Sequence, residues 1–201
     1  MNLTVGQTPV ADQGFRPTCA AMATTAAHEY ARDGLELSVE HLWANTDARG
    51  GVMPSGAKLT VLRTALMIDG QCEEREWPYD GTVGTPAPLP LPNGIYKASA
   101  GCQLTSASVA VVRTELAAGR PAVLVINPNS AFGLGAEPID AATTDPVDDF
   151  LHAVVVVAYD DATSLVKVRN SWGLTWGNRG YADVTYEFIA LRGRAVMSVV
   201  I

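Results

Sequence analysis

Apolar residues recur at helical spacing in the first half of the chain. Residues 19–32 are dominated by Ala and Met with few breakers, and Gly34 follows, which is typical of a helix that stops there. Leu59, Leu62 and Leu66 fall on one stripe of a further helix that Gly70 would end. The helices expected from this spacing cover residues 19–32, 39–46, about 56–69 and about 106–118.

Valine-rich runs bounded by turn residues fill the second half of the chain. They predict strands at residues 122–127, 152–160, 165–170, 180–186 and 194–201. Residues 128–150 contain Gly, Pro and Asp throughout and are predicted to be a loop, and the proline-rich stretch 77–94 is predicted to be a long irregular connection. Helices followed by an antiparallel sheet predict an α+β fold of two lobes with a cleft between them.

Charge and hydropathy exclude two classes of partner. The chain has 201 residues, 48% of them hydrophobic, which is enough for a sizeable core. Its formal charge is −7, from 14 Lys and Arg against 21 Asp and Glu, and the basic residues are scattered singly, so we expect no nucleic-acid partner. The longest apolar run, residues 153–159, falls far short of the ~18 residues that span a membrane, so no membrane partner is expected.

The number of cysteines indicates whether the protein works in a reducing or an oxidising compartment. The three cysteines, Cys19, Cys72 and Cys102, are too few for a disulfide framework and leave at least one thiol unpaired. The first ten residues contain no secretory signal, so we expect a cytoplasmic protein. The alternative is export as part of a larger or processed chain, in which Cys72 and Cys102 pair. Neither C-x-x-C nor H-x-x-x-H spacing occurs, so no metal site and no cofactor are expected.

Cys19 stands where a polar loop becomes the first predicted helix. Thr18 can act as the N-cap, and the helix macrodipole favours negative charge at this end. No acidic side chain lies in that helix before Glu29, so nothing local opposes a thiolate. A free thiol has a pKa near ~8.5, so Cys19 needs a base if it is a nucleophile rather than a packed apolar residue.

Of the three histidines, His152 is the one placed to be that base. His28 follows Cys19 by about 900° of helical rotation and ~13 Å of rise, so it points elsewhere. His41 has no polar partner motif, and both residues are predicted to be packing or surface side chains. His152 opens an apolar strand directly after a polar loop. Asn170, at the end of the next strand, can accept the second imidazole N–H, but by itself it would be interpreted as a turn residue.

Three blocks of the chain resemble the papain-like cysteine peptidases. They are "DQGFRPTCAA" around Cys19, "LHAVVVVAYD" around His152 and "VRNSWGLTWGNRGY" around Asn170. His152 and Asn170 follow Cys19 by 133 and 151 residues, against about 130–150 in the family. A weaker match is "GQCEEREWPYDG" at 70–81, and the likeness reaches from residue 12 to about 190.

The resemblance implies a papain-like two-lobe fold. Residues 10–105 would form the helical N-terminal lobe, and residues 106–201 an antiparallel, β-barrel-like C-terminal lobe on which residues 1–9 pack. Together the lobes would make one catalytic domain, with the active site in the cleft between them.

The resemblance also implies roles for five residues. Cys19 would be the nucleophile and His152 the general base and acid. Asn170 would orient His152, and Trp172 would shield that hydrogen bond from water. The side-chain amide of Gln13 would join the Cys19 backbone N–H in an oxyanion hole, where one donor is worth roughly 10²–10³ in rate. Taken alone, Gln13 would be interpreted as a loop residue and Trp172 as core.

The chain departs from the family pattern around the nucleophile. The usual C-G-S-C-W is "FRPTCA" here, so the disulfide-forming cysteine before the nucleophile is missing and Ala20 replaces the aromatic residue. Residues 47–52, "DARGGV", keep a Gly-Gly pair but lack the family's cysteine, and no propeptide is expected before the domain. The pattern resembles a compact, disulfide-free bacterial branch of the family.

Five residues are candidates for binding substrate. Gly50 and Gly51 would form a backbone ledge on which an extended peptide pairs as a strand, unless they form a simple turn. Leu151, Ala153 and Pro54 would form an apolar pocket for the second residue before the cut.

An acidic run precedes His152. Asp145, Asp148 and Asp149 are interpreted as a solvated loop, or else they favour basic substrates and raise the pKa of His152.

The predicted function is that of a cysteine endopeptidase, which hydrolyses peptide bonds through an acyl-enzyme thioester. A transpeptidase or transamidase would use the same thioester and pass the acyl group to an amine. A catalytically silent pseudo-peptidase would only bind peptides or a partner protein in the cleft. The expected partner is a peptide or protein substrate, and the expected state is a monomer.

Overall fold

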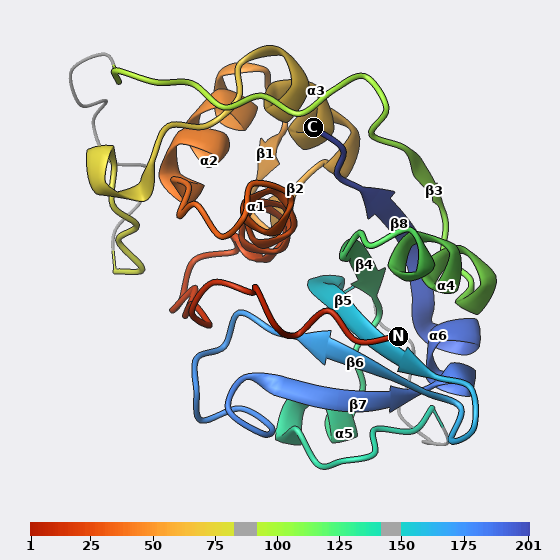
Figure 1. The fold of residues 1–201 in the computed structure, drawn as a ribbon. Helices are drawn as coiled ribbons and strands as arrows, with labels where there is room; N and C mark the ends of the chain where they lie inside the picture. The colour runs from red at the N-terminus through yellow and green to blue at the C-terminus, as the bar shows by residue number, and fades with distance from the viewer. Residues whose placement is uncertain (83–91, 142–149) are drawn as a thin grey trace.

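The computed structural model describes residues 1–82, 92–141 and 150–201. Helices gather on one side and an antiparallel sheet on the other (Figure 1), which confirms the predicted α+β fold of two lobes. The helical side consists of α1 (Cys19–Ala31), α2 (Val39–Ala48), a hairpin of β1 (Val52–Met53) and β2 (Gly56–Ala57), α3 (Leu59–Ile68) and the 3-10 turn η1 (Glu74–Glu76).

The sheet has six strands in the order β3-β8-β4-β5-β6-β7, and every neighbouring pair is antiparallel. The strands are β3 (Leu104–Ser106), β4 (Ala122–Ile126), β5 (His152–Asp160), β6 (Leu165–Arg169), β7 (Tyr181–Thr185) and β8 (Gly193–Ser198). Three helices accompany them: α4 (Val109–Ala117), α5 (Ser130–Leu134) and α6 (Tyr186–Arg192).

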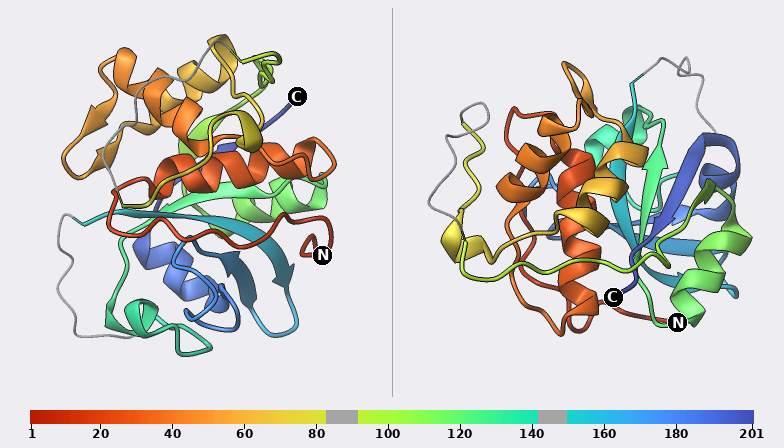
Figure 2. Two further views of the ribbon diagram at one scale, coloured as in Figure 1. Left: turned by 90° about the vertical axis from the view of Figure 1, so that its left-hand side faces the viewer. Right: turned by 90° about the horizontal axis from the view of Figure 1, so that it is seen from above.

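Helix α1 lies between the two lobes and is buried along most of its length (Figures 1 and 2). Small side chains such as Ala21, Ala23 and Ala27 allow α2 and α3 to pack on one side and β4 and β5 on the other. Because both lobes clamp this helix, its first residue, Cys19, is held where they meet.

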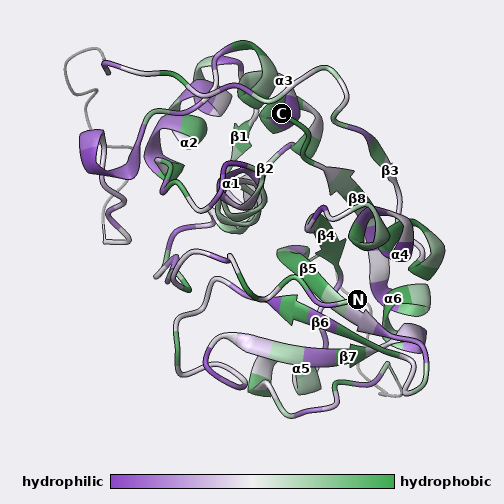
Figure 3. Cartoon of the chain, viewed as in Figure 1, coloured by the Kyte–Doolittle hydropathy of each residue, from purple (hydrophilic) through white to green (hydrophobic). Residues whose placement is uncertain are grey.

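Strand β5 is buried on both faces. Val155 and Val157 belong to the core shared with α1, whereas Val154 and Val156 belong to a second core under α4, α5 and α6. A strand covered on both faces has no polar alternation, which explains the unbroken run of valines. Hydrophobic residues accordingly colour β4, β5 and β8 in Figure 3.

Each end of the chain packs on a different lobe. At the N-terminus, Leu3 donates a backbone hydrogen bond to Val157 in β5 at 2.7 Å. At the other end, Val199 is buried in the core that contains α1, α2 and α3. The carbonyl of Val200 accepts a hydrogen bond from the backbone of Ser99 at 2.7 Å, and the end of the chain lies beside α3 in Figure 1.

The predicted elements agree with the observed ones in order and main type and differ at several ends and short elements. The helix predicted from about 56 begins at Leu59, after the β1–β2 hairpin, and the strand predicted to reach 201 ends at Ser198. Residues 128–150, predicted to be a loop, contain α5, which the Asn129 side chain caps by accepting from the Phe132 N–H at 2.9 Å. The strand predicted to reach residue 186 ends at Thr185, whose hydroxyl caps α6. Strand β3 precedes α4, so that helix starts at Val109 rather than at about 106. These short elements depend on single polar caps and lack a long apolar pattern.

His28 is a fully buried packing residue, as predicted. Gln71 donates through Nε2 to Thr25 and to the Ser38 carbonyl, so its Oε1 accepts the hydrogen bond of 2.9 Å from His28 Nδ1. The other ring nitrogen accepts from Arg32 Nε at 2.9 Å. The ring must therefore be neutral, and burial lowers the pKa of His28 to about 4.

Acid should therefore destabilise the protein through His28. The unfolded state binds a proton near pH 6.5 and the folded state only near pH 4, so stability is full above pH 6.5 and is lost as the pH falls toward 4. This one group accounts for about 3 kcal/mol over that window. Urea unfolding of the native protein and of His28→Gln at pH 7 and pH 4.5 measures it. A parallel loss of stability in both proteins would contradict the assignment.

Candidate active site

Cys19 is half-buried at the start of α1. Thr18 takes the N-cap position, but its hydroxyl pairs with that of Tyr79 at 2.7 Å and does not cap the helix, contrary to the sequence prediction. Burial raises the pKa of the Cys19 thiol, and the backbone of Ala153 and of Ala20 lowers it in part. Burial therefore favours the protonated thiol over a standing thiolate at Cys19.

His152 and Asn170 form a buried pair. His152 Nε2 lies 2.6 Å from Asn170 Oδ1, and the two residues are only 2% and 3% exposed. The backbone N–H of Ser171 also points to Asn170 Oδ1, at 2.8 Å, so that atom is the amide oxygen and accepts. His152 must then carry its proton on Nε2 in the neutral ring, which leaves Nδ1 able to accept a proton.

Aromatic rings enclose the His152 imidazole. Trp172 lies with its ring centroid 4.5 Å away at an interplanar angle of 35°, and the ring of Phe132 meets the imidazole edge-on at 5.8 Å. Trp176 packs against both Phe132 and Trp172. This apolar wall lowers the pKa of His152 to about 4, against a smaller opposite effect of Asn170.

Burial therefore penalises a lone charge on Cys19 and a lone charge on His152. Moving one proton from the thiol to Nδ1 creates both charges together, and their attraction in a site of low dielectric opposes both penalties. The arrangement favours reaction by proton transfer between the two groups over a standing charge on either one.

Gln13 is buried and fixed at both ends of its side-chain amide. Its Nε2 donates to the Arg16 carbonyl at 2.8 Å, and its Oε1 accepts from the Ser171 hydroxyl at 2.8 Å. Its backbone N–H donates to the Ser171 carbonyl at 2.9 Å. The second N–H of the amide has no partner among the described residues.

A pocket of about 370 Å³ opens beside Cys19 and His152. Two of the predicted pocket residues, Leu151 and Ala153, line it, and Met53 lines it from the helical lobe. The structure thus brings one apolar hollow together with the thiol and the imidazole.

Pro54, which was predicted to line the apolar pocket, does not line it, and neither do Gly50 and Gly51, which were predicted to form a peptide-binding ledge or a simple turn. Gly51 is buried, its N–H donates to the Thr46 carbonyl and its carbonyl accepts from Lys58, so neither group is free to pair with a peptide. Any Cβ at Gly51 would lie 2.6 Å from the Val61 side chain, so this glycine is required for packing. The hairpin residues Gly56 and Ala57 line the pocket instead.

Other predictions concern metals, membranes and the acidic run. Among the described residues, no group of three or more His, Cys, Asp or Glu side chains is arranged to hold a metal ion. None of the helices in the described ranges is long and apolar enough to cross a membrane. Asp145, Asp148 and Asp149 lie outside the described residues.

Three residues of the site were not predicted from the sequence. Phe132 lies on α5, within the run predicted to be a loop, and Ser171 follows Asn170 in a block whose tryptophans give the stronger sequence signal. Arg16 carries the carbonyl that holds Gln13. The available signals were an aromatic residue after an Asn-Ser cap and an arginine at the position of a missing cysteine.

Known proteins resemble this chain throughout its length. The model of the papain family cysteine proteases matches residues 4–195. A cathepsin L-like proteinase of Fasciola hepatica is 28% identical over 187 residues, which cover 87% of this chain and 55% of that protein. The chain spans about half the length of several curated relatives that it matches.

Solved structures of cysteine proteases also resemble this chain. The crystal structure of xylellain, a cysteine protease from Xylella fastidiosa, matches with a TM-score of 0.77 and 25% identity over 99% of this chain and 84% of that one. A cysteine protease of Carica candamarcensis in complex with E-64 has a TM-score of 0.73 at 19% identity, over 100% of this chain and 97% of that one. The second match shows likeness of fold alone.

Proposed function

Because the chain belongs to the papain family of cysteine proteases, we propose that it is an endopeptidase that hydrolyses peptide bonds through Cys19, His152 and Asn170. The observation that carries this proposal is the His152–Asn170 hydrogen bond. It places the proton on Nε2 and leaves Nδ1 as a base, in a pocket that Cys19 shares.

The proposed reaction has two halves. In the first, His152 Nδ1 takes the thiol proton and the Cys19 sulfur attacks the peptide carbonyl. Gln13 and the Cys19 backbone N–H stabilise the oxyanion, and the imidazolium gives its proton to the leaving amine as the C–N bond breaks. In the second half, His152 takes a proton from water and the resulting hydroxide attacks the thioester. As the C–S bond breaks, the imidazolium returns that proton to the sulfur and the carboxylic acid product leaves.

The rings of Trp172 and Phe132 support this role for His152. They exclude water from the hydrogen bond to Asn170, so the ring turns less easily away from Cys19. Asn170 itself touches no substrate in this proposal and acts through His152. No cofactor or metal ion takes part in either half of the reaction.

We also propose that the enzyme is a cytoplasmic monomer that acts on peptides or proteins. All three cysteines are free thiols, and Cys72 and Cys102 are buried, so the fold does not depend on an oxidising compartment. The likeness to the Xylella fastidiosa enzyme supports a bacterial origin.

Hydrolysis of a fluorogenic peptide library by the native protein and by Cys19→Ala tests the proposed function. Labelling with E-64, which is bound in the structure of the Carica candamarcensis cysteine protease, is measured in parallel. We expect cleavage and covalent labelling of Cys19 in the native protein and neither in the variant. A folded native protein that shows neither would contradict the proposal.

The same samples separate the two alternatives. Product masses with an added amine identify a transpeptidase or transamidase, because the acyl group then appears on the amine. Peptide binding that survives Cys19→Ala, without turnover by the native protein, would identify a pseudo-peptidase.

A further inference from the structure

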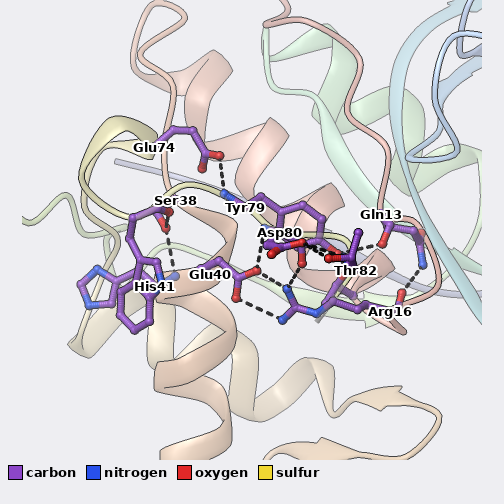
Figure 4. A network of polar contacts seen from close by, with 11 residues as sticks. Gln13, Arg16, Ser38, Glu40, His41, Glu74, Tyr79, Asp80 and Thr82 are labelled. Atoms are coloured by element: carbon purple, nitrogen blue, oxygen red, sulfur yellow. Dashed lines mark hydrogen bonds and ion pairs between the residues drawn. The ribbon is translucent and has the colours of Figure 1, made fainter. Parts of the chain in front are cut away.

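A buried ion pair anchors the segment that precedes Cys19. The guanidinium of Arg16 contacts both carboxylate oxygens of Glu40, in the first turn of α2, and the Glu40 side chain is fully buried. The same guanidinium donates to the Asp80 carbonyl at 2.7 Å, and the Asp80 N–H donates to Glu40 at 3.2 Å (Figure 4). Arg16 thus joins the loop before α1 to two other parts of the helical lobe.

Tyr79 reinforces this anchor. The Arg16 guanidinium lies over its ring, 4.9 Å from the centroid. The Tyr79 hydroxyl donates to the Gln13 carbonyl at 2.9 Å and pairs with the Thr18 hydroxyl at 2.7 Å. One side chain therefore holds both ends of the segment 13–18, and this segment carries the proposed oxyanion donor.

The backbone of Arg16 contacts the side-chain amide of Gln13 directly. Gln13 Nε2 donates to the Arg16 carbonyl, so the amide can turn only if that carbonyl moves. We propose that Arg16, held by Glu40 and Tyr79, is the positioning residue for the Gln13 donor; this rests on the proposed function. Arg16 stands at the position where the family pattern has a disulfide-forming cysteine, and it makes a charge-assisted, bidentate contact with Glu40.

A buried ion pair contributes little net stability but breaks at a high cost if one partner is lost. The ion pair matters here because it fixes the position of the Gln13 donor. A displacement of a catalytic donor by about 1 Å can lower the reaction rate by roughly 10²-fold. Lysine keeps the charge of Arg16 but has no planar fork for two parallel contacts. Arg16→Lys and Tyr79→Phe therefore loosen the anchor without burying an unpaired charge.

Two probes separate positioning from general support. A peptide aldehyde adds to Cys19 and places an oxyanion in the site, whereas iodoacetamide alkylates the thiolate without forming one. For Arg16→Lys and Tyr79→Phe we expect kcat to fall about 10- to 100-fold with KM little changed. Aldehyde affinity should fall by the same factor, and the iodoacetamide rate should stay unchanged.

A double-mutant cycle with Gln13 completes the test. Gln13→Ala alone should lower the cleavage rate by about 10²–10³-fold. Adding Arg16→Lys to Gln13→Ala should lower the rate no further, because the donor that Arg16 positions is already gone. Arg49→Lys, in the exposed pair with Asp69, is the matched control and should leave all readouts unchanged.

Either of two results would overturn the proposal. One is an equal loss of alkylation rate in Arg16→Lys, and the other is a full multiplicative loss in the Gln13→Ala background. If the native protein cleaves no peptide at all, the proposed function fails instead, so the two failures are distinguishable.

The pocket beside Cys19 independently carries an inference about substrate. Two of its lining residues, Lys58 and Arg194, are cations, and no acidic residue lies among the described residues that line it. Arg194 uses Nη1 on the Leu191 carbonyl at 3.2 Å, and neither cation forms an ion pair with a described acidic side chain. Apolar side chains such as Leu59 and Val125 form much of the remaining wall.

We infer that this pocket takes a side chain with an apolar stem and an anionic end, such as glutamate, and this also rests on the proposed function. The two cations are exposed, so together they should favour Glu over the isosteric Gln by about three- to tenfold. The preference should shrink as the ionic strength rises, because salt screens exposed charges.

Paired peptides that differ only by Glu or Gln at the second position before the cut test this inference. Native protein should cleave the Glu peptide faster than the Gln peptide. The double variant Lys58→Glu and Arg194→Glu should cleave the Gln peptide faster. Arg113→Glu reverses a single cation that lies outside the pocket and pairs with Asp161, just after the far end of β5, and it should not reverse the order. Faster cleavage of Gln at low salt, or a preference that survives the double reversal, would overturn the inference, whereas no cleavage of either peptide contradicts the proposed function.

Discussion

Replacing Cys19 or His152 by alanine is expected to lower kcat/KM by about 10⁴-fold or more, and replacing both should lower it no further. The reason is that burial raises the pKa of the Cys19 thiol, so in the proposed mechanism the sulfur becomes nucleophilic only when His152 takes its proton. Without either partner, the other has no chemistry to perform. The two losses should therefore overlap almost completely.

Progress curves of the two single variants and the double variant measure this effect, with E-64-treated native protein as the floor. Cys72→Ala removes a buried free thiol that does not line the pocket, and it should retain activity. Losses that multiply in the double variant, or Cys19→Ala with near-native activity, would show that the two residues do not act as a unit.

The second large effect is expected at Phe132. This ring is fully buried among His152, Trp172, Trp176 and Phe188, so Phe132→Ala should lower the free energy of unfolding by about 3–5 kcal/mol. It should also admit water to the imidazole and move the pKa of His152 from about 4 up toward its ordinary value. A lower kcat should follow, because the ring is then less firmly oriented.

Phe188→Ala is the matched control for this prediction. Phe188 is equally buried and stacks on Phe132 at 6.1 Å, but among the described aromatic contacts its ring does not touch His152. It should cost similar stability in urea unfolding and leave the NMR-measured pKa of His152 unchanged. Equal shifts of the pKa in both variants would mean that Phe132 acts only through the core.

The fold could be predicted from the sequence because its main signals are long and redundant. The alanine-rich run that begins at Cys19 and the valine run that begins at His152 each extend over many residues, so one misjudged position does not change the outcome. The separations of His152 and Asn170 from Cys19 match the family pattern and predict a shared site, and the structure brings His152 and Asn170 into contact.

The glycine pair shows why the substrate-facing residues were harder to predict. Two adjacent glycines fit a peptide-binding ledge and a tight turn equally well, because both need an unhindered backbone. Only the three-dimensional neighbours decide, and the closeness of Val61 and Thr46 to Gly51 identifies packing as the reason. The role of Arg16 was hidden for a related reason, since its partner Glu40 lies 24 residues away in an unremarkable helix.

The placement of the two chain ends also constrains the order in which the protein is completed during synthesis. Met197 and Val199 belong to the core that contains α1, and the carbonyl of Val200 closes a hydrogen bond with Ser99. During synthesis, the core around α1 would therefore gain its last members only when residues 197–200 emerge. A product truncated before Met197 would lack these core residues, and the proposed site would rest on an incompletely packed helix.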